Sequence, residues 1–176
     1  MAESVEKRSV RRLEAARGYL ALGMPTHALR ELAVIDPVAV DRLPVDLLRG
    51  DCLRESGRHA EAVQAYRRAL ANTPRDVAVY IGLGCCYKRL DQLPKAITAM
   101  EEAYRIAPRE PVVLYNMACY YALQGDKNLA LSWLGRALRI EASLRKLIPD
   151  EHDFDQLRHD PDFRFVAGIR DVRETL

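Results

Sequence analysis

Long apolar runs are missing from this sequence of 176 residues, and so are several features that mark whole classes of protein. No apolar stretch approaches the roughly 20 residues that a membrane-spanning helix needs. The first ten residues carry charges and no apolar centre, unlike a secretory signal. These absences predict a protein that does not span a membrane and is not secreted.

A strong excess of one charge is also lacking. The chain has 27 Lys and Arg against 25 Asp and Glu, for a formal net charge of +2. Dedicated nucleic-acid-binding domains are more basic than this. Four cysteines stand without the paired spacing of a disulfide framework, which favours a reducing compartment. We therefore expect a cytoplasmic protein with no nucleic-acid partner, whose cysteines act as small apolar residues.

Motifs for catalysis are absent as well. The sequence has no glycine-rich phosphate loop, no nucleophile elbow and no zinc-protease histidine pair. The acidic run at 150–155 lacks the glycine and ligand spacing of a calcium loop. Acidic residues before a helix are favoured by the helix dipole, so capping explains this run better. The sequence thus predicts no enzyme activity, no cofactor and no metal site.

What the chain does have is a fixed internal period. Gly50, Gly84 and Ala118 are equally spaced along the sequence, which places a small residue at one position of each repeat. Small residues allow two helices to approach closely where they cross, and large apolar residues then fill the space beside the crossing. The other series with the same spacing are Tyr19, Leu53, Tyr87 and Tyr121; Ala28, Ala62, Ala96 and Ala130; and Leu32, Tyr66, Met100 and Leu134.

The clearest repeat unit covers residues 77–110 and resembles the tetratricopeptide repeat. The resemblance implies an all-α, right-handed superhelical solenoid of about four helix pairs with a C-terminal helical cap. The expected array spans 1–144, with a degenerate repeat at 9–42 and regular repeats at 43–76, 77–110 and 111–144. The residues that carry the resemblance are Tyr80-x2-Leu83-Gly84-x2-Tyr87, then Ala96-x3-Met100, Ala103 and Pro108.

Two parts of the chain depart from this pattern. In the second repeat Asp46 stands where a large aromatic is usual, and Arg49 where a leucine is usual. The segment 145–176 has lost the period and contains all three phenylalanines. A solenoid needs a cover over the apolar face of its last helix, so we expect this segment, with about two short helices near 153–159 and 161–170, to be the cap.

In the tetratricopeptide family the first helices of successive repeats line a concave groove that usually holds a partner peptide. Some of the residues at these positions, Ile81 and Cys85 above all, could instead pack one helix on another. Tyr115 is the expected anchor, because large stiff aromatics dominate interface energies. The groove positions implied by the resemblance are Leu47, Asp51 and Arg54; Ile81, Cys85, Lys88 and Arg89; and Tyr115, Asn116 and Cys119.

The implied function is that of a non-catalytic adaptor, a monomer that holds a mixed acidic and apolar segment of a protein partner. Only Asn116 matches the clamp of family members that bind chaperone C-termini, so that ligand is not expected. A groove with Asp51, Cys85 and Cys119 at equivalent places also lacks the polar base-reading residues of pentatricopeptide RNA binders. The alternative is a structural subunit that self-associates through its convex face or its cap.

Overall fold

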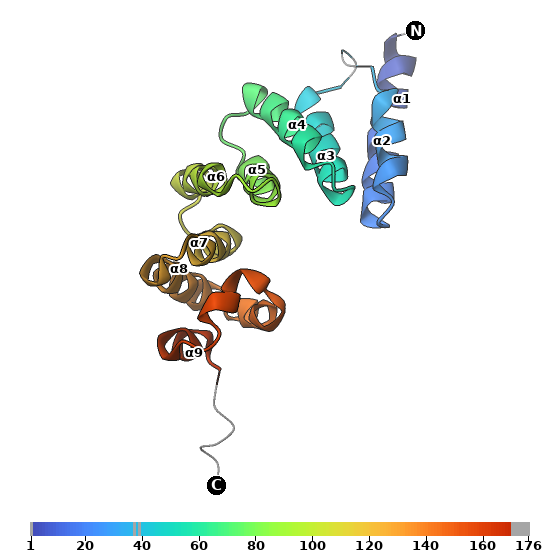
Figure 1. Ribbon diagram of the computed structural model, residues 1–176. Coiled ribbons are helices and arrows are strands. Elements are labelled where there is room, and N and C mark those ends of the chain that lie inside the picture. The colour runs from blue at the N-terminus through green and yellow to red at the C-terminus, as the bar shows by residue number, and fades with distance from the viewer. Residues whose placement is uncertain (1, 37, 39, 170–176) are drawn as a thin grey trace. The chain divides into compact units, whose positions relative to one another are not determined.

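The computed structural model describes residues 2–36, 38 and 40–169, and every regular element in these ranges is a helix (Figure 1). The prediction of an all-α chain built from helix pairs is therefore confirmed. None of the described helices is both long enough and apolar enough to cross a membrane. The α-helices are α1 Ala2–Ala21, α2 Pro25–Ala33, α3 Arg42–Glu55, α4 His59–Asn72, α5 Val77–Arg89, α6 Leu93–Ile106, α7 Pro111–Gln124, α8 Lys127–Ile140 and α9 Pro161–Ala167, with 3-10 helices η1 Ala142–Asp150 and η2 His152–Leu157.

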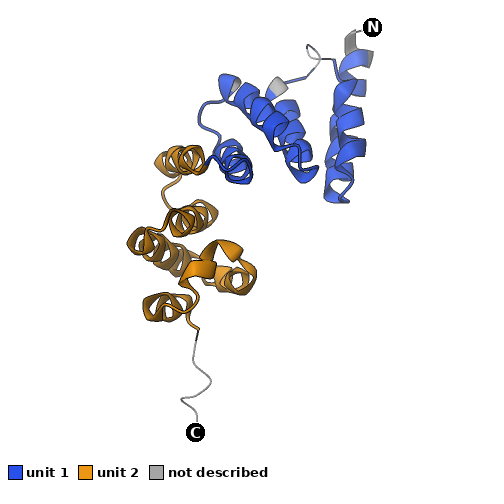
Figure 2. Cartoon of the chain, in the orientation of Figure 1, with its two compact units in different colours: residues 1–92 blue, residues 93–176 orange. Residues whose placement is uncertain are grey.

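The chain divides into two compact units, residues 1–92 and residues 93–176 (Figure 2). The boundary lies inside the expected third repeat, between α5 and α6. The segment 145–176, which we expected to cap the array, falls in the second unit together with α6, α7 and α8.

A left-handed residue ends the first helix of each pair. Gly23, Gly57 and Gly125 have φ angles of 70°, 72° and 85°, and they occupy the same position in their repeats. Glycine has no Cβ and adopts this conformation without steric cost. The equivalent residue of the third pair is Asp91, with φ 55°. Aspartate is one of the few other residues that tolerate this region, so the turn has the same shape there.

In the first unit the packing of one tyrosine ring requires glycine at two positions. The ring of Tyr66, on α4, is fully buried. A Cβ at Gly50 on α3 would lie 2.5 Å from this ring, and a Cβ at Gly82 on α5 would lie 2.4 Å from it. Real Cβ atoms do not come so close to other heavy atoms, so both positions need glycine for Tyr66 to fit.

The unusual residues of the second repeat form an ion-pair network. Asp46 on α3 is buried and lies 3.2 Å from Arg68 Nε and 3.7 Å from Arg49 Nη1. Arg49 also donates to the main-chain oxygen of Leu32, in the last turn of α2. The last carbonyls of a helix have no partner inside the helix, so Arg49 satisfies one of them. This bond explains how the early end of α2 is stabilised.

The second unit has its core between α7 and α8. Leu114, Ala118 and Leu134 are fully buried there, and Ala130 is almost so. Asp126 caps α8 by accepting from Leu129 N at 2.9 Å, and Pro111 opens α7 after its cap Glu110. A proline in the first turn costs no hydrogen bond, because that N–H would have no partner in the helix.

The tail, defined here as residues 142–167, packs on these two helices: η2 on α7, and η1 and α9 on α8. Ile148, Phe154 and Phe163 contribute its fully buried side chains. The tail holds three short elements, η1, η2 and α9, where the sequence predicted about two. It covers apolar surface of the last helix pair, as expected of a cap.

Candidate functional site

Seven of the ten predicted groove residues lie in the first unit, on α3 and α5, which pack against each other. Leu47, Ile81 and Cys85 are half-buried, so each presents part of its side chain to solvent. Arg89 is exposed, and Lys88 is half-buried in the last turn of α5. We call this surface the groove face; its residues are Leu47, Asp51 and Arg54 on α3, with Ile81, Cys85, Lys88 and Arg89 on α5.

The charges of α3 largely neutralise one another. Arg54 Nη1 lies 2.9 Å from Glu55 Oε1, and Arg54 Nη2 lies 3.9 Å from Asp51 Oδ1. Asp51 also accepts a 2.7 Å hydrogen bond from the hydroxyl of Tyr66. Asp51, Arg54 and Glu55 border a recess of about 360 Å³, whose other lining residues are Leu20, Gly23 and Pro25. With two carboxylates to one guanidinium, the α3 end of the groove face is not a strong site for anions.

Burial raises the pKa of the Asp51 carboxyl above its usual value, and the hydrogen bond from Tyr66 and the positive charge of Arg54 oppose this shift. Desolvation disfavours the charged form of a carboxyl, whereas hydrogen bonds to the carboxylate favour it. Burial also raises the pKa of Tyr66, with the negative charge of Asp51 acting in the same direction. The Tyr66 hydroxyl therefore stays neutral and donates to Asp51. This hydrogen bond holds the Asp51 side chain in place at one edge of the groove face.

The α5 end of the groove face differs in charge. Lys88 and Arg89 are the only charged residues between Val77 and Arg89, and both stand in the last turn. Cations are favoured there by the helix dipole. The α5 end is therefore positive and partly apolar, through Ile81 and Cys85.

Two of the three groove residues predicted on α7 are covered, which corrects the sequence-based prediction. Tyr115 has 6% of its surface exposed and Cys119 has 2%. The ring of Phe154, on η2, meets the Tyr115 ring edge-on with 5.8 Å between centroids. Tyr115 is thus part of the core beneath the tail, and the expectation of an exposed aromatic anchor at this position is wrong. We call the pair Tyr115 and Cys119 the α7 face.

Asn116 is the third residue predicted on α7, and it remains half-exposed. Its Nδ2 donates to Val112 O one turn earlier, at 2.8 Å. The side-chain amide is therefore engaged by its own helix.

Hydrogen bonds and ion pairs hold the tail over α7 and α8. Arg158 donates to the main-chain oxygens of Glu151 and Ile148, at 3.0 and 3.4 Å, and so joins η1 to η2. Lys127 at the start of α8 pairs with Asp160 at 2.5 Å and with Asp162 at 2.8 Å. The Lys127 bond lowers the pKa of Asp160 below its usual value. These contacts add to the packing of Phe154, which also lies 5.3 Å from the Phe163 ring.

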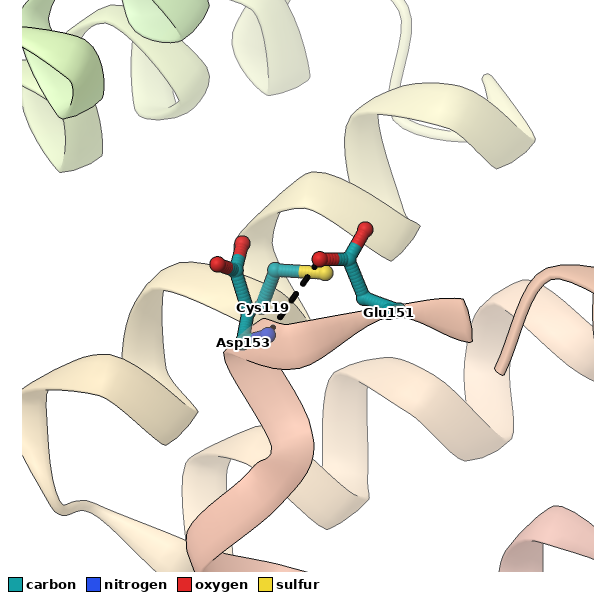
Figure 3. Close-up of side chains that lie close together, drawn as sticks. All are labelled: Cys119, Glu151 and Asp153. Carbon is teal, nitrogen blue, oxygen red and sulfur yellow. Dashed lines mark hydrogen bonds between the residues drawn. The ribbon is translucent and has the colours of Figure 1, made fainter. Parts of the chain in front are cut away.

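Cys119, Glu151 and Asp153 form a group of potential metal ligands, with one ligand atom of each lying within 4.8 Å of the others (Figure 3). Glu151 Oε1 accepts from Asp153 N at 3.2 Å and so caps η2, as the sequence predicted for this acidic run. Structural zinc sites are usually four-coordinate, with cysteine and histidine ligands. This group offers only one thiol and two carboxylates, and one of the carboxylates already serves as a helix cap. It therefore differs from a structural zinc site.

The Tyr115 hydroxyl is buried beside this group and has no hydrogen-bond partner among the described residues. Burial raises the pKa of Tyr115, and the nearby Cys119, Glu151 and Asp153 raise it further. The hydroxyl therefore stays neutral beside the two acids of the tail.

Three residues of the tail cover the α7 face: Glu151, Asp153 and Phe154. The sequence-based prediction did not place them at the groove. A signal for them is present in the sequence: α7 contains no Asp, Glu, Lys or Arg. A helix that is apolar all round is buried on more than one side. The equivalent helix α5 carries two cations at its end and leaves its groove face partly open.

None of the four cysteines, all of which lie in the described ranges, forms a disulfide, as expected from their spacing. Burial raises the pKa of Cys52 to about 11 and that of Cys86 to about 12. Thiols, unlike thiolates, are poor nucleophiles, so these two residues act as small apolar side chains.

Comparison with known proteins gives one family. Two sequence models of the tetratricopeptide repeat match adjacent stretches, residues 47–111 and residues 112–144, which together span more than half of the chain. No curated protein matches the sequence significantly.

Several solved structures are similar. A crystal structure of MamA has a TM-score of 0.69 at 23% identity, covering 78% of this chain and 81% of that chain. TTC0263, a thermophilic TPR protein in Thermus thermophilus, has a TM-score of 0.69 at 20% identity, with 91% and 97% covered. YrrB, described as a TPR protein with an unusual peptide-binding site, has a TM-score of 0.70 at 17% identity, with 81% and 73% covered. At these identities the likeness concerns the fold.

Proposed function

Because the chain belongs to the tetratricopeptide repeat family, we propose that it is a non-catalytic adaptor that holds a segment of a partner protein on its groove face. The observation that carries the proposal is the partly open surface of α5, where Ile81 and Cys85 lie beside Lys88 and Arg89. An apolar strip beside cations suits a segment with both acidic and apolar residues. YrrB, which has a similar fold, is described as having a peptide-binding site, and this also supports the proposal.

The adaptor acts as a monomer in the cytoplasm. Four cysteines without a disulfide support a reducing compartment. Within the array of repeats, 1–144, we assign the partner to the α3 and α5 positions, because Tyr115 and Cys119 are already covered by the tail. The residues of the proposed site all lie in the first unit: Leu47, Asp51, Arg54, Ile81, Cys85, Lys88 and Arg89.

The proposal is tested by screening the purified protein against an array of short peptides of diverse charge and hydrophobicity. A variant with Ile81→Ala and Lys88→Ala should lose most of the peptides that the wild type retains. Gln64→Ala, an exposed change on α4, is the matched control and should retain them. Equal retention by the groove variant and the wild type would reject the groove face as the binding surface.

A second candidate function is self-assembly through the tail. Phe165 on α9 is 87% exposed and Leu147 in η1 is 53% exposed. Large exposed apolar side chains are common at contacts between subunits. Light scattering at two concentrations separates the two functions: a mass that rises with concentration in the wild type, but not in Phe165→Ser, would favour assembly over the monomeric adaptor.

A further inference from the structure

One segment of this chain already occupies groove positions of a repeat, and its chemistry indicates what the open repeat binds. The segment is Glu151–Phe154 at the start of η2, which packs on α7. Its contacts with the α7 face involve two acids and one aromatic ring. The carboxylates of Glu151 and Asp153 lie near the thiol of Cys119 (Figure 3), and Phe154 packs on the ring of Tyr115.

The α5 end of the groove face has the same positions. Ile81 is the equivalent of Tyr115 and Cys85 the equivalent of Cys119, each exactly one repeat earlier in the sequence. Both helices therefore offer a large apolar side chain and, one turn later, a cysteine. On α7 this pair is buried under the tail, whereas on α5 both residues keep part of their surface exposed.

The order of contacts along α7 predicts where acids would lie on α5. Phe154 contacts the earlier position, Tyr115, and the two acids lie at the later position, Cys119. On α5 the same direction leads from Ile81 past Cys85 toward the cations Lys88 and Arg89. The equivalents of these cations on α7 are Ala122 and Leu123, which carry no charge. A segment of this chemistry therefore gains a charge complementarity on α5 that α7 does not provide.

The α3 end suits such a segment less well. At the position of Cys85 and Cys119, α3 carries Asp51, a carboxylate that would repel a second acid. Its cation Arg54 stands beside two carboxylates, those of Asp51 and Glu55, so the α3 end has no excess of positive charge. Charge therefore selects α5 rather than α3.

We infer that the α5 end of the groove face binds a partner segment of the form acidic-x-acidic-aromatic, in the way that Glu151–Phe154 lies on α7. The aromatic residue packs on Ile81, and the acids lie over Cys85 toward Lys88 and Arg89. This inference rests on the proposed function and names the chemistry of its partner.

The test uses the full chain and a synthetic peptide with the sequence of residues 148–158. A photoreactive phenylalanine replaces Phe154 in the peptide, so that crosslinking followed by mass spectrometry identifies the helix that the aromatic residue contacts. Fluorescence anisotropy of a labelled peptide with the native phenylalanine measures affinity. Crosslinks are expected in α5, and alanine in place of the peptide's phenylalanine should weaken binding about tenfold or more.

Two protein variants with the same change in net charge locate the acids. Lys88→Glu should weaken binding several-fold at low salt, and the difference should shrink in 0.5 M NaCl, because salt screens exposed charges. Arg30→Glu, an exposed change on α2, is the control and should leave the affinity unchanged. Ile81→Ala should weaken binding at both salt concentrations.

Three results would overturn the inference. Crosslinks confined to α7 would mean that the peptide only exchanges with the chain's own tail. A dimer of the wild type that is lost in Phe154→Ala would make the occupant a second copy of this chain. If array peptides of other chemistry bind through Ile81 and Lys88 while the acidic-aromatic peptide does not, the inference fails and the adaptor function stands.

Discussion

The first helices of the third and fourth repeats, α5 and α7, have equivalent positions in the repeat but different surroundings. α7 carries no charged residue, and the tail covers its Tyr115 and Cys119. α5 ends in two cations and leaves Ile81 and Cys85 half-exposed. The first helix of a repeat thus has its groove positions buried in the fourth repeat and partly exposed in the third. What distinguishes α7 is that the tail packs on it and buries Tyr115 and Cys119.

The largest effect expected from this comparison concerns Phe154. Its fully buried ring packs between Tyr115 and Phe163, so Phe154→Ala should lower the free energy of unfolding by about 3–5 kcal/mol. Phe165→Ala removes the same atoms from a side chain that is 87% exposed. This variant should change the free energy of unfolding by about 0.5 kcal/mol or less. Urea unfolding followed by circular dichroism measures both. Similar losses in the two variants would show that η2 does not pack on α7 as described.

A smaller effect is expected on α5, at Gly82. A Cβ there would meet the Tyr66 ring at 2.4 Å, so Gly82→Ala should cost about 1–3 kcal/mol through overpacking. Gly135 on α8 is the control, since the nearest atoms to a Cβ at that position lie at 3.6 and 3.8 Å. Gly135→Ala should be neutral or stabilising, because alanine favours a helix over glycine by up to about 1 kcal/mol. Denaturation midpoints that move equally for both glycines would contradict the packing of Tyr66 against α5.

The two equivalent cysteines allow the comparison to be made within one molecule. A maleimide reagent should modify Cys85 before Cys119, because Cys119 is only 2% exposed and reacts when the tail opens locally. Phe154→Ala should then speed the modification of Cys119 by about tenfold or more, since each ~1.4 kcal/mol of lost stability raises an open population tenfold. The rate at Cys85 should not change. Mass spectrometry of proteolytic fragments measures both rates in one sample.

The helix pairs and their turns could be predicted from sequence because they follow from a short-range rule that recurs once in every repeat. Gly23, Gly57 and Gly125 stand at the turns for the same steric reason each time. The position of the tail on α7 could not be predicted in this way. Residues 145–176 have no repeat partner, and nothing in local periodicity says which face a non-repeating segment covers. The absence of charge in α7 was the available signal.

The predicted groove residues differ in exposure for a reason that the repeat pattern does not contain. The family pattern assigns groove positions by their place in the repeat, and it treats Ile81 and Tyr115 alike. Exposure depends on long-range packing, so it separates them: Ile81 remains half-exposed while Tyr115 is buried. The requirement for glycine at position 82 was also not predicted. Gly82 lies outside the motif, and the large ring of Tyr66 leaves no room for a Cβ there.

The smallest expected effect lies in the turns that follow α5 and α7. Asp91 has φ 55° where the equivalent Gly125 has φ 85°. A left-handed conformation costs most residues about 1–2 kcal/mol, less for aspartate, while glycine loses more backbone entropy on folding. Asp91→Gly should therefore raise the free energy of unfolding by only about 0.5–1 kcal/mol. Gly125→Asp should lower it by more than this gain, because the φ angle of Gly125 lies further from the left-handed minimum than that of Asp91. Thermal unfolding of the two variants measures both. If Asp91→Gly destabilised the protein, the side chain of Asp91 would have to stabilise its turn by more than its backbone conformation costs.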